Sequence, residues 1–191
     1  MRRTRRNTVR IIGGFWRSRI LEFPDAADLR PTPDRVRETI FNWLGQDLSG
    51  MACLDLFAGS GALGFEAASR GAARVVMVES DGEACKSLQD FRALVGAKAV
   101  EVVRGDALEY LARSQAHFDV VFLDPPFRQN LLPAIFRLLK GGKGMRVYVE
   151  SSEPFTPGSG WQELKRSRAG QVSYQLFEWR SDDQGGLPGN V

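Results

Sequence analysis

The sequence has little of the chemistry that builds metal centres or disulfide frameworks. Among 191 residues there are only two cysteines and one histidine, too few for a disulfide scaffold, a zinc finger or a histidine-rich metal site. No apolar run approaches the length of about 20 residues that spans a bilayer. We therefore expect a cytoplasmic protein without a metal, long enough to bury a core of its own. The sequence leaves the oligomeric state open, and a monomer is the default expectation.

Positive charge is concentrated at the start of the chain. The first 37 residues contain ten arginines and four acidic residues, a net charge of +6, whereas the whole chain carries +3, which leaves −3 for the rest. Arginine outnumbers lysine by 21 to 5, and its planar fork matches phosphate oxygens. A basic arm on a nearly neutral body indicates nucleic acid as a partner, although a solvated basic tail has the same composition.

The first 48 residues predict a hairpin followed by a helix. Residues 8–12 and 15–23 have strand character around Gly13–Gly14, a dipeptide that suits a tight turn. On the second strand, Arg17 and Arg19 would share one face.

A proline-rich loop follows the hairpin. Thr32 is expected to cap a helix that has Pro33 at its first position and runs to about Leu48.

From Met51 onward, short apolar segments alternate with helical ones. The predicted strands are 51–57, 74–79, 100–104, 118–123 and 145–149, and the predicted helices lie near 61–70, 82–95, 107–113 and 129–140. This alternation indicates βαβ units and a mainly parallel, doubly wound α/β sheet. Residues 161–168 and 171–180 predict a closing antiparallel hairpin, and 182–191 a disordered tail.

A glycine-rich segment follows the first strand of this sheet. Gly59, Gly61 and Gly64 fit the G-x-G-x-x-G spacing between a strand and a helix, and Glu79 ends the next strand twenty residues after Gly59. Such glycines let a ligand approach the backbone at a helix N-terminus, and the distal acid suits ribose hydroxyls. A turn used only for packing is the plainer interpretation, but strand, helix and acid together favour a nucleotide site.

Acidic residues recur where the predicted strands end, at Asp55, Glu79, Asp106 and Asp124. In a parallel sheet these ends line one crevice, where ligands bind. A single acid there can simply cap the following helix, as we expect of Asp81, but four in series indicate a site.

The segment Asp124-Pro125-Pro126-Phe127 closes the fourth predicted strand. Two consecutive prolines cannot continue a sheet ladder, so the chain leaves the sheet stiffly there. Asp124 and the carbonyl oxygens of this turn are acceptors only and suit a substrate with N–H donors, while Phe127 offers a face for a flat ring.

The glycine segment Asp-Leu-Phe-Ala-Gly-Ser-Gly, together with Asp-Pro-Pro-Phe, resembles the class I S-adenosylmethionine-dependent methyltransferases that modify exocyclic amino nitrogens. More specifically, the chain resembles the RsmD family, which methylates N2 of one guanine in bacterial 16S ribosomal RNA. The segments that carry this resemblance are Arg10–Arg17, Leu29–Thr39, Phe41–Leu44, Tyr148–Ser151 and Ala169–Val172. It extends over residues 9–180 and departs from the family at the short stretch 139–145.

The resemblance implies a seven-stranded Rossmann-like methyltransferase sheet over residues 49–181 and S-adenosylmethionine as the cofactor. The resemblance assigns eight residues to the cofactor. The methionine end would face Asp55, Phe57, Gly59 and Gly61. The ribose would face Glu79 and Ser80, and the adenine would face Asp106 and Ala107. The target guanine would be held by Asp124, Pro125, Pro126 and Phe127, with Asp124 and the Pro125 carbonyl accepting the amine hydrogens.

The resemblance also makes residues 1–48 an RNA-binding extension. Its partner would be 16S rRNA, within the small ribosomal subunit or an assembly intermediate. The predicted RNA contacts are Arg10, Arg17, Arg19, Thr32, Arg35 and Arg37.

Three other functions remain open from the residues alone. An adenine-N6 DNA methyltransferase has a similar Pro-Pro-aromatic turn, but this chain shows no separate target-recognition domain. A nicotinamide-dependent oxidoreductase accounts for the glycine spacing but gives the Asp-Pro-Pro-Phe turn no role. A non-catalytic RNA-binding assembly protein accounts for the arginines but not for the cofactor crevice.

Overall fold

The computed structural model describes residues 6–24 and 32–180. The predicted disordered tail, 182–191, and the arm arginines Arg2, Arg3, Arg5 and Arg30 lie outside the described residues. Within the described ranges, no helix has the length and apolar character needed to cross a bilayer.

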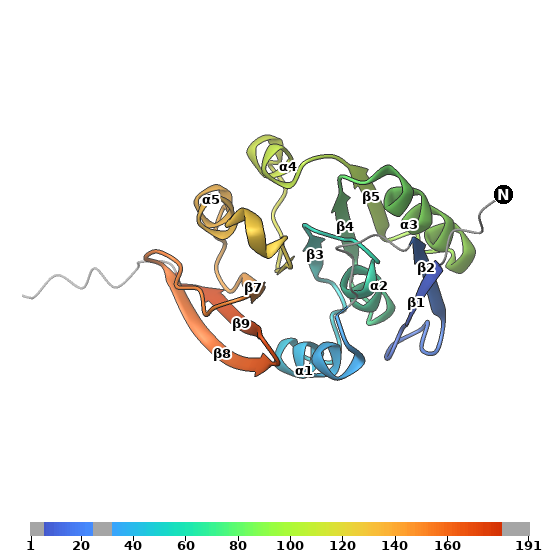
Figure 1. Ribbon diagram of the computed structural model, residues 1–191, viewed down its shortest axis with the longest axis horizontal. Coiled ribbons are helices and arrows are strands. Elements are labelled where there is room, and N and C mark those ends of the chain that lie inside the picture. Colours follow the sequence, from blue (N-terminus) through green and yellow to red (C-terminus); the bar gives the residue numbers. More distant parts are fainter. Residues whose placement is uncertain (1–5, 25–31, 181–191) are drawn as a thin grey trace, which may run out of the picture.

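A seven-stranded sheet forms the centre of the molecule (Figure 1). Its strands are β3 (Ala52–Asp55), β4 (Arg74–Glu79), β5 (Val100–Arg104), β6 (Val120–Leu123), β7 (Arg146–Ser151), β8 (Trp161–Ala169) and β9 (Val172–Trp179). Their order is β5-β4-β3-β6-β7-β9-β8; the first five are parallel, and β9 and β8 are antiparallel. The predicted fold class is confirmed, and the strand order reverses between β3 and β6, where doubly wound folds bind ligands.

Helices cover both faces of the sheet. They are α1 (Asp34–Leu44), α2 (Ala62–Ser69) and α3 (Gly82–Val95) on one face, and α4 (Ala107–Arg113) and α5 (Leu132–Leu138) on the other, with a 3₁₀ turn η1 (Phe127–Gln129) after β6. Because successive strand residues point to opposite faces, Phe122 packs in the core beneath α1 to α3, while Val121 and Leu123 pack beneath α4 and α5.

The N-terminal hairpin consists of β1 (Arg6–Arg10) and β2 (Ile20–Pro24), which pair antiparallel, with Arg10 opposite Ile20. The prediction of a tight turn at Gly13–Gly14 is wrong, because residues 11–19 form a longer connection that packs on the end of α2. The backbone N–H groups of Phe15 and Trp16 donate to the carbonyl and hydroxyl oxygens of Ser69. Arg17 and Arg19 therefore lie on this connection and do not share the face of a strand.

The start of α1 also differs from the prediction. Pro33 occupies the N-cap position, and no side chain caps the helix there. Thr32 instead donates its hydroxyl to Glu150, 3.1 Å away. The helix ends at Leu44, before Gly45 (φ +101°), earlier than the predicted Leu48.

The hairpin shares its core with the sheet. Val9, Ile11, Leu21 and Phe23 are buried in the same cluster as residues of α1, α2 and the central strands. In Figure 1 the hairpin lies beside α3, and β2 contacts that helix. The residues predicted as an extension are therefore an integral part of one hydrophobic core.

Candidate active site

The glycine loop joins the end of β3 to the start of α2. Gly59 and Gly61 both have positive φ, at +50° and +80°, where side chains are strained. At Gly61, the N-cap of α2, an added Cβ would also lie 2.5 Å from Leu88 and 2.8 Å from Phe65. The loop therefore needs glycine there for its conformation and for its fit against α3.

Glu79 links this loop to the end of β4. Its carboxylate accepts hydrogen bonds from the N–H groups of Gly59 (2.7 Å) and Asp81 (2.8 Å), and the Ser80 hydroxyl lies 3.5 Å away. Each carboxylate oxygen has a second lone pair, so Glu79 keeps acceptor capacity for the hydroxyl groups of a ribose.

Asp106 begins α4 and Asp81 begins α3, each as an N-cap. Asp81 accepts from Ala84, as predicted. Both cap bonds of Asp106, from Leu108 and Glu109, end on Oδ1, so they do not use Oδ2. Ala107 is buried behind it. The end of β5 thus offers an exposed aspartate, one oxygen of which makes no cap bond, beside a small apolar residue, a combination that can face an amine-bearing ring.

Three acidic side chains meet at the carboxyl ends of the neighbouring strands β3, β6 and β7. Asp55 ends β3 and pairs with Phe122, while Leu123 pairs with Val149. Asp124 and Glu150 follow this last pair directly, so they come side by side. All three face the side of α1 to α3, because their positions alternate with residues packed beneath α4 and α5.

This environment favours the neutral acids. Burial raises the pKa of Asp55 to about 7, with further contributions from the charges of Glu79 and Glu150, although the N–H of Gly64 donates to its carboxylate at 3.0 Å. Burial, and then the charges of Glu150 and Asp55, raise the pKa of Asp124 well above its usual range. Within the described residues, no group of acids, histidines and cysteines is arranged to hold a metal ion.

The turn after Asp124 leaves the sheet as predicted. Pro125 is buried and Pro126 is exposed. Phe127 begins η1 and is 44% exposed. The Phe127 side chain is therefore partly accessible, three residues after Asp124.

The six residues predicted to contact RNA have different surroundings. Arg10, Arg17, Arg19 and Arg35 are exposed. Thr32 and Arg37 are buried, at 7% and 0% exposure. Both side chains are hydrogen-bonded within the protein, so the structure gives them a structural role, and their predicted contact with RNA stays a prediction.

Arg37 is the centre of a buried network. Its guanidinium donates to the carbonyls of Thr32 (3.1 Å) and Arg10 (2.7 Å) and pairs with Glu66 (3.3 Å) and Asp34 (2.5 Å). Glu66 is also fully buried; it pairs with Arg70 at 2.9 Å and accepts the N–H of Ile12. This network joins the hairpin, α1 and α2.

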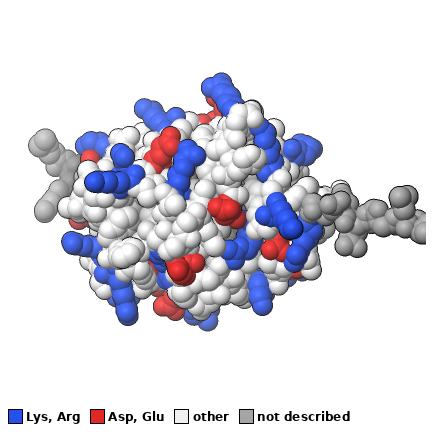
Figure 2. Space-filling model, turned by 180° about the vertical axis from the view of Figure 1, so that it is seen from behind, with Lys and Arg blue, Asp and Glu red and all other residues white. Residues whose placement is uncertain are grey.

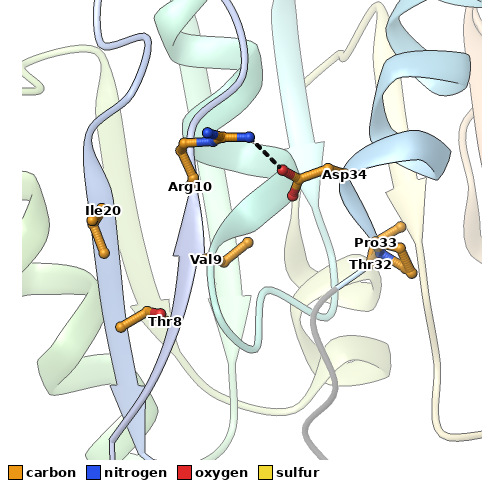
Figure 3. A pocket seen from close by; sticks show the side chains of 7 residues that line it. All are labelled: Thr8, Val9, Arg10, Ile20, Thr32, Pro33 and Asp34. Atoms are coloured by element: carbon orange, nitrogen blue, oxygen red, sulfur yellow. Dashed lines mark hydrogen bonds and ion pairs between the residues drawn. The ribbon is translucent and has the colours of Figure 1, made fainter.

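A pocket of about 370 Å³ lies between the hairpin and the start of α1 (Figure 3). It is lined by Thr8, Val9, Arg10, Ile20, Thr32, Pro33 and Asp34. Arg10 and Asp34 form an ion pair of 3.1 Å across it. Through Thr32 the pocket borders the hydrogen bond to Glu150, so the hairpin and the carboxyl cluster meet at this point.

Basic side chains are spread over the face of the molecule that is turned away from the viewer in Figure 1. Figure 2 shows Lys and Arg around the rim of that face, with a few acidic side chains between them and no continuous basic patch.

Comparisons with known proteins agree with this geometry. The family model described as "Conserved hypothetical protein 95", the RsmD family, matches residues 9–178. The chain belongs to this family. A relative from Escherichia coli named "Ribosomal RNA small subunit methyltransferase D" is 43% identical over 178 residues, which cover 89% of each chain. Its namesake from Haemophilus influenzae is 42% identical, covering 89% of this chain and 93% of its own.

Solved structures give the same assignment. The Escherichia coli methyltransferase yhhF matches 91% of this chain and 99% of its own with a TM-score of 0.84 and 40% identity. An RNA methyltransferase from Salinibacter ruber, in complex with S-adenosyl-L-homocysteine, shares the fold at 22% identity and a TM-score of 0.60. This RsmD-family chain is therefore a methyltransferase, and the oxidoreductase and non-catalytic alternatives are not supported.

One residue of this RsmD-family site was missed in the sequence. Glu150 accepts hydrogen bonds from the Tyr148 hydroxyl (2.9 Å) and the Thr32 hydroxyl (3.1 Å) and lies beside Asp124. Its signal was present, because Glu150 follows an apolar strand as Asp55, Glu79 and Asp124 do. The segment Tyr148–Ser151 had been used only for its family resemblance.

The raised pKa of Asp55 gives a prediction about stability. Its usual value of 3.8 in the unfolded chain rises to about 7 on folding, so its stabilising contribution is complete below about pH 4 and is lost as the pH rises through about 7. Between about pH 4 and pH 8 the parent should lose on the order of 4 kcal/mol of its free energy of unfolding through Asp55. We expect Asp55→Asn not to show this loss. The variant should therefore gain stability relative to the parent as the pH rises.

Urea unfolding at both pH values measures this effect. The control is Asp90→Asn on α3, an exposed position, which should follow the parent at both pH values. Parallel pH dependence in Asp55→Asn and the parent would show that Asp55 is ionised in the folded protein.

Proposed function

We propose that this protein transfers the methyl group of S-adenosylmethionine to the exocyclic N2 of one guanine in bacterial 16S ribosomal RNA. The observation that carries this proposal is the Asp124–Phe127 turn at the end of β6, directly beside the glycine loop that follows β3. The names of the 43% and 42% identical relatives support ribosomal RNA of the small subunit as the substrate. S-adenosylmethionine supplies an electrophilic methyl group on a positively charged sulfur.

The cofactor fits the donors and acceptors at the ends of β3, β4 and β5. Asp55, Phe57, Gly59 and Gly61 would surround the methionine end. Glu79 and Ser80 would bind the ribose hydroxyls, for which carboxylate acceptors are the right partners. Asp106 and Ala107 would hold the adenine, with Oδ2 of Asp106 available to its amine.

The target amine requires acceptors rather than a covalent catalyst. The lone pair of guanine N2 is delocalised into the ring, so it attacks poorly unless its hydrogens are held. Asp124 and the carbonyl of Pro125 would accept these hydrogens and turn the lone pair toward the methyl group. Catalysis then consists mainly of positioning and electrostatic stabilisation.

The target base must leave its stack to reach this turn. Extrusion costs a few kcal/mol, and stacking on the exposed ring of Phe127 offsets about 1–3 kcal/mol of that cost. Pro126, exposed beside it, keeps the turn rigid.

The hairpin connection is the proposed grip on RNA. Phe15 is 86% exposed. It lies between Gly13, whose carbonyl accepts a hydrogen bond from the Ser69 hydroxyl, and the exposed Arg17 and Arg19. An exposed aromatic ring beside arginines suits an unpaired base and its phosphates. The bonds to Ser69 hold this surface in place on α2.

Removing these two charges tests the grip. We expect the double variant Arg17→Gln, Arg19→Gln to raise the KM for RNA while kcat stays unchanged, because phosphate contacts position the substrate without touching the reacting atoms. Each lost contact should reduce the slope of log affinity against log salt by about 0.7 to 0.9.

The matched control is Arg113→Gln, Arg137→Gln, which removes two exposed charges from α4 and α5 on the opposite layer. Equal salt slopes in the two double variants would place the RNA elsewhere.

The decisive experiment is transfer of labelled methyl from S-adenosylmethionine to small ribosomal subunits that lack their native modification, followed by nucleoside analysis. We expect N2-methylguanosine at a single site. Label on adenine, or only on DNA, would support an adenine-N6 DNA methyltransferase instead. Parallel reactions with free 16S rRNA and with assembly intermediates identify the form of the substrate, which we propose is a preformed ribonucleoprotein. We propose that the enzyme acts on it in the cytoplasm as a monomer.

A further inference from the structure

Glu150 lies in the site without a part in the reaction described so far. It is the penultimate residue of β7, is 7% exposed, and lies in register beside Asp124 on β6. Adjacent strands of a sheet are about 4.8 Å apart, and both side chains point toward α1 to α3. The two carboxyl groups are therefore neighbours, with Glu150 buried and Asp124 partly exposed.

The hydrogen bonds of Glu150 favour it over Asp124 as the charged member of this pair. The hydroxyls of Tyr148 and Thr32 both donate to its Oε1, at 2.9 and 3.1 Å. Burial raises the pKa of Glu150, and these two bonds act against that rise because they favour the carboxylate form. The pKa of Asp124 is raised by burial and by the charges of Glu150 and Asp55, and no hydrogen bond contributes to lowering it.

The groups around the pair are mostly acidic. Asp55 faces it from β3, with Glu79 beyond it on β4, and Tyr148 and Tyr174 face it from β7 and β9. From α1, Arg37 reaches the backbone carbonyl of Thr32, but its charge is matched by Glu66 and Asp34. Two adjacent carboxyl groups in such surroundings favour a state that holds one proton between them.

We propose that Asp124 and Glu150 form a carboxyl pair that releases its proton when the sulfonium cation of S-adenosylmethionine binds and regains one from the guanine amine during methyl transfer. Glu150 is the positioning residue of this pair, held by Thr32 and Tyr148. This inference rests on the proposed function, which brings the sulfonium and the amine to Asp124.

The charges and atoms of the step balance. The N2 lone pair forms the new bond to the methyl carbon, and the electron pair of the carbon–sulfur bond goes to sulfur, which becomes neutral. The amine nitrogen, now positive, keeps the electrons of one N–H bond, and that proton moves to the Asp124 carboxylate. The carboxyl pair thus regains the proton that it held before the cofactor bound, while the sulfur of the cofactor loses its positive charge.

The test is the number of protons released on cofactor binding, measured by calorimetry in buffers of different ionisation enthalpy near neutral pH. S-adenosylmethionine and S-adenosylhomocysteine differ in the sulfonium charge, so we expect release, up to one proton, with the first and none with the second. Glu150→Gln keeps an oxygen acceptor for Tyr148 and Thr32 but removes the charge that, after burial, contributes most to the raised pKa of Asp124, so the release should be clearly smaller than in the parent. The control Glu153→Gln, exposed just beyond β7, should keep the release of the parent.

The outcomes separate the inference from the function on which it rests. Equal release with both cofactors, or full release in Glu150→Gln, overturns the carboxyl pair while leaving the methyltransferase intact. Failure of both cofactors to bind overturns the proposed function. If Glu150→Gln does not fold, Asp124→Asn decides instead, since breaking the pair from its other side should abolish the release.

Discussion

Replacing Asp124 by alanine should abolish measurable methyl transfer while S-adenosylmethionine still binds. The carboxylate is the side-chain acceptor of the Asp-Pro-Pro-Phe turn, and it lies beside the glycine loop without being part of it. Losing one preorganised electrostatic partner of the reacting group costs about 10²- to 10³-fold in rate. Single-turnover transfer and calorimetric binding of the cofactor measure the two effects separately.

The same variant should fold at least as stably as the parent at neutral pH. Burial raises the pKa of Asp124 well above its usual range. At a pH above the usual aspartate pKa, the unfolded chain is therefore favoured, because Asp124 ionises more easily there than in the folded protein. Asp90→Ala on α3, an exposed position, is the control for transfer and stability. Near-normal transfer by Asp124→Ala would overturn the assignment of the turn.

Replacing Arg37 by methionine should destabilise the protein by about 3 to 5 kcal/mol, since removing one partner of a buried ion pair leaves the other charge uncompensated. Here the orphaned group is Glu66, which is 0% exposed. The carbonyls of Thr32 and Arg10 lose their donor as well. Arg70 still pairs with Glu66, which places the effect toward the lower end of this range.

Chemical denaturation measures this change, and Arg74→Met provides the comparison. Arg74 pairs with Glu101 at 3.1 Å, but both side chains are about half exposed, and such surface pairs contribute about 0 to 1 kcal/mol. Similar losses in the two variants would mean that the buried network contributes no more than a surface pair.

The fold could be predicted from the sequence because its signals are local. Strands that are apolar on both faces alternate with helices from Met51 onward, and this pattern alone requires a parallel sheet covered on both sides. The acids at Asp55, Glu79 and Asp124 could be placed together for the same reason, since parallel strands bring their carboxyl ends to one edge.

The local signals fail for residues whose partners are distant in the sequence. Arg37 looks like any exposed helix arginine until Glu66 is placed beside it, 29 positions away. Thr32 precedes a helix as a capping residue does, but it bonds Glu150, 118 positions away. Gly13–Gly14 suggested a tight turn because nothing in the sequence indicated that the connection would rest on Ser69. In each case tertiary packing overrode a local preference.

The attachment of residues 11–19 to α2 also bears on how the chain folds as it is made. Ile12 donates to Glu66, 54 positions later, and Trp16 to Ser69, 53 positions later. Contacts so far apart form slowly, and during translation they cannot form before their second partner has been synthesised. The proposed RNA grip is thus synthesised before α2, yet it cannot complete its structure until α2 has followed.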